Sequence, residues 1–272
     1  MLIIIAKTDT EIERSAHGNN GLNQKHCPYL KHTLTTMQII DFGILQMFLG
    51  LFDLRDADQA KEYLDRIGVE YRFQCYHENR PDGCHRLGDY LDAFKHDWEK
   101  ARLVYKMNCE KNLYGQSCFK YGNYSLLGRG GAKSMEEAFG AFTKGCDNGY
   151  SASCHNAGLM HHAGQIGKKD FVKSAELLKR GCDTGNAPSC QMLSAYFITG
   201  MEGVEKDMKK AFEYAVSACE KGHMYACANV SRMYKLGEGA EQNQELSDKY
   251  KKRARELFRD VSESQRPILS GE

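Results

Sequence analysis

The chain has 272 residues, 42% of them hydrophobic and 27% charged, which is enough to bury a core. Its 37 basic residues nearly balance its 36 acidic residues, so it lacks the basic excess of a dedicated nucleic-acid-binding protein. Only 4 prolines occur, and this scarcity favours long uninterrupted helices over a turn-rich sandwich.

The first 46 residues show no internal repeat, and we predict that they form a poorly ordered extension, with a short helix near residues 37–51. The chain begins MLIIIAKTDTEIER, an apolar run followed at once by acidic residues. This pattern matches neither a secretory signal nor an Arg-rich mitochondrial presequence. The apolar stretch 39–54 is interrupted by polar residues and is shorter than the roughly 20 residues of a membrane-spanning helix, so no transmembrane segment is expected.

A repeat begins after this extension and is marked by cysteines. Ten of the 11 cysteines fall into five close pairs whose members are 8 or 9 positions apart, and the first members of successive pairs are 34, 37, 36 and 37 positions apart. The pairs are Cys75/Cys84, Cys109/Cys118, Cys146/Cys154, Cys182/Cys190 and Cys219/Cys227. Cys27 is left over. A fixed period of this length is typical of helical repeat proteins.

Each segment between pairs predicts a helix of about eleven residues, a break and a second helix of about fifteen. From the second segment onward the break is rich in glycine, as at Gly164 and Gly167, which suits a helix end and a tight turn. We therefore predict an all-α fold, a right-handed α/α superhelical solenoid of about five helix-turn-helix repeats over residues 47–260. A lead helix over 56–67 and a charged helix over 243–260 are expected to cap its ends, and residues 261–272 form a tail.

Each cysteine pair spans the link between the second helix of one unit and the first helix of the next. Seven or eight residues with turn-forming side chains separate the two cysteines, so their Cα atoms can come within disulfide range. Disulfides across the solenoid would indicate an oxidising compartment. Two alternatives stay open, namely buried reduced thiols and zinc ligands, although the spacing is not that of the familiar zinc knuckles.

The repeat itself resembles a known family. The period of 34–37 residues, with a Leu-Gly or Tyr-Gly pair, a Gly-rich turn and a later Lys-Ala, is similar to the Sel1-like repeat, a relative of the tetratricopeptide repeat. The stretches CYHENRPDGCHRLGDYL, SCHNAGLMHHAGQ and ACEKGHMYACANVSRMYKLGEG resemble the branch of this family that serves cytochrome c oxidase assembly. The resemblance covers about residues 52–260.

This resemblance implies a location and a function. It implies a protein of the mitochondrial intermembrane space that needs no cleaved presequence and supports the assembly of respiratory complex IV, with complex I as a second target. It also implies haem binding through His and Met ligands, and copper metallochaperones as clients whose disulfides are acted upon. Another branch of the family is secreted, rich in cysteine and described as binding β-lactams.

The first cysteine pair is the candidate for thiol–disulfide exchange. The attacking group in such exchange is an accessible thiolate with a lowered pKa. The linker between Cys75 and Cys84 carries His77 and Arg80, which could stabilise a thiolate, and this pair lies near one end of the solenoid. No C-x-x-C motif is present, so the alternative is that this pair is structural like the other four.

The candidate axial ligands of a haem, carried over from the resemblance, are four histidines and one methionine. They are His77, His155, His162, His223 and Met233. His155 and His162 are seven positions apart on one predicted helix and so share a face. The alternative for each histidine is an ordinary surface or packed position near the start of a helix.

Two further patterns are weaker. The run from Ser117 to Lys120 matches the S-x-x-K motif of serine β-lactamases by letter only, because no S-D-N or K-T-G follows. A basic run near the C-terminus predicts a solvated helix face, or else a membrane or partner contact; it comprises Lys249, Lys251, Lys252, Arg253 and Arg255. Two functions remain open, a monomeric scaffold that binds client proteins and a haem-binding thiol–disulfide reductase that uses the bound haem or a labile cysteine pair.

Overall fold

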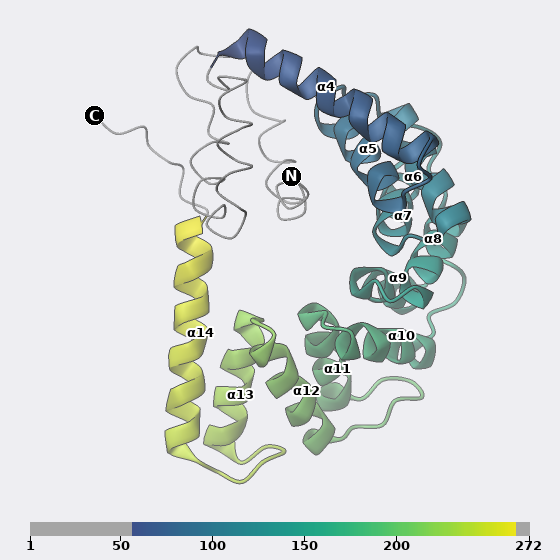
Figure 1. The fold of residues 1–272 in the computed structure, drawn as a ribbon. Helices are drawn as coiled ribbons and strands as arrows, with labels where there is room; N and C mark the ends of the chain where they lie inside the picture. Colours follow the sequence, from purple (N-terminus) through teal and green to yellow (C-terminus); the bar gives the residue numbers. More distant parts are fainter. Residues whose placement is uncertain (1–55, 265–272) are drawn as a thin grey trace. The chain divides into compact units, whose positions relative to one another are not determined.

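The computed structural model describes residues 56–264, and these form eleven α-helices without an extended strand. The chain divides into two compact units at Asn108/Cys109, a point inside helix α6. In chain order the helices are α4 (Ala57–Tyr76), α5 (Pro81–Ala93), α6 (Trp98–Asn112), α7 (Gly115–Leu127), α8 (Met135–Asp147), α9 (Ser151–Ala163), α10 (Phe171–Asp183), α11 (Ala187–Thr199), α12 (Met208–Glu220), α13 (Met224–Leu236) and α14 (Gln244–Ser264) (Figure 1). The predicted all-α architecture of repeated helix pairs is thus confirmed.

The two end helices are longer than the sequence predicted. Helix α4 continues to Tyr76, about two and a half turns beyond the predicted end at residue 67, and α14 continues to Ser264 rather than ending at residue 260. The helices between these two are more even than predicted, because eight of them span 13 residues each. The predicted extension 1–46 and its short helix lie outside the described residues, as does Cys27.

In the second unit each helix packs against the next one along the chain, from α7 to α14 (Figure 1). Local signals define the helix ends. The Asp170 carboxylate accepts a hydrogen bond from the backbone N–H of Lys173 (2.9 Å) and so caps the start of α10. Helix α9 ends at Gly164, whose φ of 70° is a left-handed conformation that disfavours side chains with a Cβ. The predicted Gly-rich breaks therefore lie where the chain turns.

The core of the second unit lies along the seam between successive helices. Ala211, Ala215 and Ala218 on α12 are completely buried, and their small side chains allow α11 and α13 to approach closely. A second cluster contains Phe142 and Met160 from α8 and α9. Because no helix pair could bury these residues alone, the stability of the unit depends on stacking of its repeats.

A glycine on the first helix of a repeat faces a large side chain on the second helix. A Cβ at Gly122 on α7 would lie 2.5 Å from a carbon of the Phe142 ring on α8. Gly158 on α9 meets Leu178 on α10 in the same way, at 3.0 Å. The Leu-Gly or Tyr-Gly signature of the sequence thus has a packing cause, since the missing Cβ leaves room for a buried ring or aliphatic side chain.

The described part of the first unit comprises α4, α5 and most of α6. Its core contains Tyr71, Leu87, Tyr90 and Val104, and burial raises the pKa of Tyr71 to about 12. The Tyr90 hydroxyl donates to the Asp65 carboxylate (3.3 Å), which also binds the Lys95 ammonium (2.6 Å). These contacts join α4 to the end of α5.

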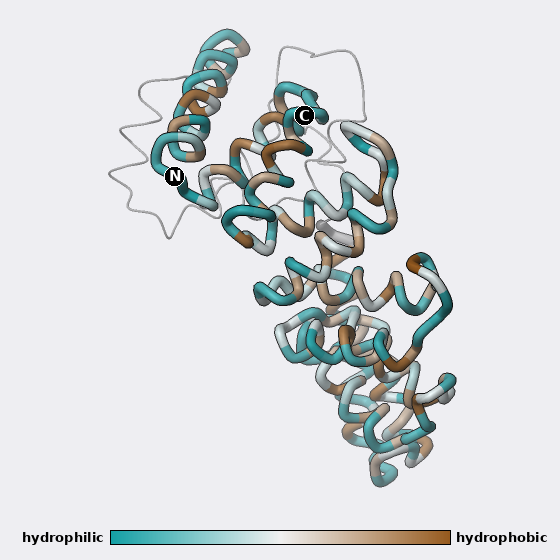
Figure 2. The backbone as a smooth tube through the Cα atoms, turned by 90° about the vertical axis from the view of Figure 1, so that its right-hand side faces the viewer, coloured by the Kyte–Doolittle hydropathy of each residue, from teal (hydrophilic) through white to brown (hydrophobic). Residues whose placement is uncertain are grey.

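Hydrophobic and hydrophilic residues are interspersed along the described chain, so its helices are not apolar all round (Figure 2). Within residues 56–264 no helix combines the length and the apolar character that crossing a bilayer requires.

Candidate functional site

Five disulfides cross-link the described chain, at the five pairs that the cysteine spacing predicted. They are Cys75–Cys84, Cys109–Cys118, Cys146–Cys154, Cys182–Cys190 and Cys219–Cys227. Each joins one helix to the start of the next, across a tight link, with Cα atoms 4.4–4.7 Å apart. Because these sulfurs are bonded to each other, the reduced-thiol and zinc alternatives do not describe these ten cysteines.

Tight local geometry makes these junctions possible. In the junction between α10 and α11, the Asn186 side chain accepts hydrogen bonds from the Ser189 N–H (2.9 Å) and hydroxyl (2.8 Å). These bonds cap α11 and fix the direction in which the chain enters it. Gly181, one residue before Cys182, lies against the Ser189 side chain, so a larger residue there would push the two helices apart.

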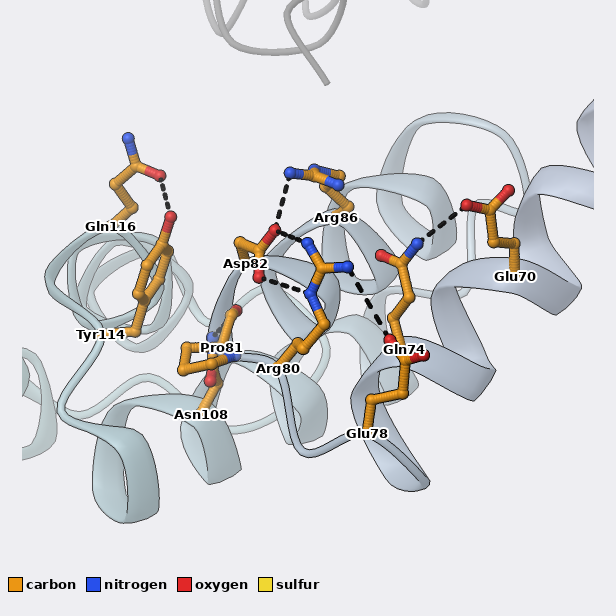
Figure 3. A network of polar contacts seen from close by, with 10 residues as sticks. All are labelled: Glu70, Gln74, Glu78, Arg80, Pro81, Asp82, Arg86, Asn108, Tyr114 and Gln116. Atoms are coloured by element: carbon orange, nitrogen blue, oxygen red, sulfur yellow. Dashed lines mark hydrogen bonds and ion pairs between the residues drawn. The ribbon is translucent and has the colours of Figure 1, made fainter. Parts of the chain in front are cut away.

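The junction around Cys75 and Cys84 contains a network of ion pairs (Figure 3). The Arg80 guanidinium contacts the Asp82 carboxylate (2.8 Å) and lies 3.8 Å from Glu78. Arg86 also binds Asp82 (2.8 Å). Burial by itself would raise the pKa of Asp82, but the hydrogen bond from Arg80 and the charge of Arg86 outweigh it and lower that pKa.

This network bears on the predicted exchange chemistry. Cys75 and Cys84 are 3% and 1% exposed, as deeply buried as the other disulfides, so the expectation that position near one end of the solenoid exposes this pair is wrong. The Arg80 charge is directed to carboxylates rather than held free for a thiolate. The exposed His77 ring stacks on Phe73, with ring centroids 5.1 Å apart. The geometry therefore does not distinguish this pair as the reactive one.

Two of the predicted haem ligands lie on α9 and turn toward α11. His155 Nδ1 lies 3.0 Å from the Ser189 hydroxyl oxygen, and His162 Nδ1 lies 2.7 Å from the Tyr196 hydroxyl oxygen. Burial lowers the pKa of His155, which favours its neutral form. The Tyr196 hydroxyl also lies 2.9 Å from the Ser174 hydroxyl. Both histidines thus take part in contacts between repeats. His155 is packed near the start of α9, as the alternative interpretation proposed, whereas His162 lies in the last turn of that helix.

The other two predicted ligands in this unit belong to α13. His223 caps the helix, because its Nδ1 accepts from the Ala226 N–H (3.3 Å), and burial lowers its pKa. Met233 is completely buried in the core. Ten residues of helix separate the two, a rise of about 15 Å, which is too far for both to bind one iron. Seven residues, about 10 Å, separate His155 from His162. Neither His155 with His162 nor His223 with Met233 is therefore close enough along its helix for both side chains to bind one iron.

Two other sequence patterns receive a structural explanation. Ser117 is completely buried and Cys118 is disulfide-bonded, so the S-x-x-K match is not an accessible nucleophile. The five residues of the basic run all lie exposed on α14. Sequence reasoning missed the contact of Tyr196 with Ser174 and His162; the signal was a buried tyrosine near the end of the first helix of a repeat.

Known proteins resemble the chain in sequence and fold. The Sel1 repeat profile matches residues 115–150, 151–186, 187–223 and 225–259. A Xenopus tropicalis protein named cytochrome c oxidase assembly factor 7 is 42% identical over 229 residues, which covers 82% of this chain and 99% of the relative. A Drosophila melanogaster homolog of that factor is 40% identical, with 77% of this chain and 93% of the relative covered. A Sel1 repeat protein from Oxalobacter formigenes has the same fold, with a TM-score of 0.60, 22% identity, and coverage of 72% and 83%.

Proposed function

Because the chain belongs to the cytochrome c oxidase assembly factor 7 family of Sel1-repeat proteins, we propose that it is an assembly factor for respiratory complex IV. The observation that carries this proposal is the similarity to those factors along almost their whole length. A shared fold alone would not support it, since one fold serves many functions.

The proposed mode of action is binding rather than catalysis. A solenoid offers an extended surface on which client proteins can be held. In this chain the ten paired cysteines are buried at the helix junctions, where they cross-link the repeats. We propose copper metallochaperones as the clients, which is what the resemblance to the family implies.

The proposed location is the mitochondrial intermembrane space. Disulfides persist in oxidising compartments and are rare in the reducing cytosol. Five of them, one at each junction, support a location in an oxidising compartment of the mitochondrion. Protease treatment of isolated mitochondria tests this proposal. The protein should be degraded when the outer membrane is ruptured while the inner membrane stays intact, and protection at that stage would contradict it.

Depletion of the protein in cells that express it tests the assembly role. Assembled complex IV, measured on native gels together with its activity, should fall and should recover when the wild-type chain is restored. Complex I is measured in parallel, since it is the second expected target. Unchanged complex IV after complete depletion would refute the proposal. Binding of purified, metal-free copper chaperones to the full chain, measured by calorimetry, tests the client assignment separately.

Haem binding and reductase activity stay predictions of the resemblance. Titration of the full chain with haem, followed by absorbance, tests the first, with His→Ala variants at the four predicted positions. Reduction of an oxidised copper chaperone tests the second, with Cys75→Ser/Cys84→Ser as the control. Turnover that this variant abolishes would favour an enzyme over a scaffold.

A further inference from the structure

The last helix pair forms an open groove of about 590 Å³, here called the terminal groove. Helix α13 contributes Tyr225 and Lys235 to its lining, and α14 contributes Lys251, Arg255 and Phe258. Tyr225 and Phe258 are 68% and 61% exposed, unusually high values for aromatic side chains. The groove therefore combines free cations with exposed aromatic rings.

The register of the repeat explains why this surface is open. In the last four repeats, the second helix begins after a capping residue, and these caps are Ser134, Asp170, Asp207 and Asn243. Eight positions after the cap, the first three of these repeats carry completely buried apolar side chains and the fourth carries a lysine: Phe142, Leu178, Ala215 and Lys251. Twelve positions after the cap, three buried disulfide cysteines give way to an arginine: Cys146, Cys182, Cys219 and Arg255.

In the earlier repeats, neighbouring helices cover these two positions. Phe142 faces Gly122 on the first helix of its own repeat and clusters with Ala157 and Met160 on the first helix of the next. Cys219, for example, is bonded to Cys227 on α13, and α12 packs against that helix. Among the described residues no further helix follows α14, so Lys251 and Arg255 remain exposed where a helix would otherwise pack. The terminal groove therefore lies where a further helix would pack, but it carries the positive charges of a solvent-exposed surface.

The charges of the groove are only partly compensated. Arg232 forms an ion pair with Glu238 (2.8 Å). Asp248 also lines the groove, and its carboxylate accepts a hydrogen bond from the neutral Gln244 amide (3.1 Å), so it contributes one negative charge beside the cations. Within the described part of the chain, Lys251 and Arg255 have no ion-pair partner. They are four positions apart on α14, so both side chains leave the same face of the helix, with their Cβ atoms about 6 Å apart.

We propose that the terminal groove binds an acidic amphipathic helix of a partner protein. Two carboxylates one helical turn apart on that helix match Lys251 and Arg255, and apolar side chains beside them cover Tyr225 and Phe258. A bilayer is a poorer match because the cations line a groove between two helices rather than a flat face. The inference is independent of the proposed role in oxidase assembly, since it rests on this surface alone.

Fluorescence anisotropy with the full chain and a synthetic helical peptide tests the proposal. The peptide, about 18 residues long, carries two glutamates one turn apart beside a leucine stripe, and its control carries glutamines instead. Lys251→Glu/Arg255→Glu reverses the groove charges. The matched variant Lys249→Glu/Lys252→Glu makes the same change in net charge at exposed positions that do not line the groove.

We expect the groove variant to bind the acidic peptide about tenfold more weakly, and the matched variant to bind it nearly as the wild type does. A peptide with lysines in place of the glutamates should recover binding to the groove variant only. Equal losses in both variants, or equal binding of the glutamine peptide, would overturn the proposal. The proposal would also be overturned if the wild type did not bind the peptide and Lys251→Glu/Arg255→Glu instead abolished dimer formation or attachment to anionic vesicles. Circular dichroism checks that both variants fold.

Discussion

Replacing Gly122 by alanine should destabilise the protein even though alanine is the better helix former. Gly122 lies inside α7, and an added Cβ would meet three carbons of the Phe142 ring at 2.5–2.9 Å. Real Cβ contacts are not this short, so the ring or the helix must move. Phe142 is completely buried and its ring packs beside Phe119, which leaves it little room.

The size of the effect follows from two opposing terms. Forcing an extra carbon into a packed core costs about 1–3 kcal/mol, whereas glycine to alanine in a helix gains about 1 kcal/mol. Gly140 provides the matched control, because it lies on α8, is exposed, and a Cβ there would meet no atom within 4 Å. Gly140→Ala should therefore stabilise the protein by about 0.5–1 kcal/mol, and the two variants should differ by about 1–3 kcal/mol.

Urea unfolding of both variants, with the disulfides intact, measures this difference. Both substitutions restrict the unfolded chain to a similar degree, so that contribution cancels in the comparison. The midpoint of Gly122→Ala should lie below that of the wild type, and the midpoint of Gly140→Ala above it. If Gly122→Ala proved as stable as Gly140→Ala, the close contact between α7 and α8 could not be the reason for glycine in the repeat.

Three further predictions follow from single features. Cys219→Ser/Cys227→Ser should lower the free energy of unfolding by about 2.5 kcal/mol, because a closed loop in the unfolded chain is lost; unchanged stability in urea would contradict this. Burial lowers the pKa of His155, so protonation of this side chain favours the unfolded state, and the free energy of unfolding should fall as the pH drops through about 6.5. His155→Gln should lose less stability than the wild type between about pH 7.5 and 5.5. Identical urea midpoints of the wild type at the two pH values would refute this. Ser134→Ala should lower the thermal midpoint, a loss of about 1 kcal/mol, because the Ser134 hydroxyl caps α8 by accepting from the Glu137 N–H; an unchanged midpoint would argue against that cap.

The positions of the helix junctions could be predicted from the sequence because the signals are local and repeated. Each cysteine pair lies beside a turn, and five occurrences at a nearly constant period leave few alternative arrangements. Helix ends were less predictable where the repeat stops. Helix α4 extends to Tyr76 and packs against α5, a contact that no local sequence pattern predicts.

The candidate site was less predictable, since reactivity depends on what surrounds a residue. The linker near Cys75 suggested an exposed and positively charged environment, but the folded chain buries both sulfurs and directs Arg80 to Asp82. In the same way, His155 and His162 share a face as predicted, yet that face contacts α11.

The sequence by itself determined the repeat, its helix pairs and the cysteines that cross-link them, because periodicity and turn chemistry are properties of neighbouring residues. Only the tertiary structure decided what each repeated position does. The glycine at position 122 makes room for Phe142 from another helix. Within one basic run, Lys251 and Arg255 line a groove while Lys249 and Lys252 do not. These differences depend on which helix packs where, and packing joins residues that the sequence keeps apart.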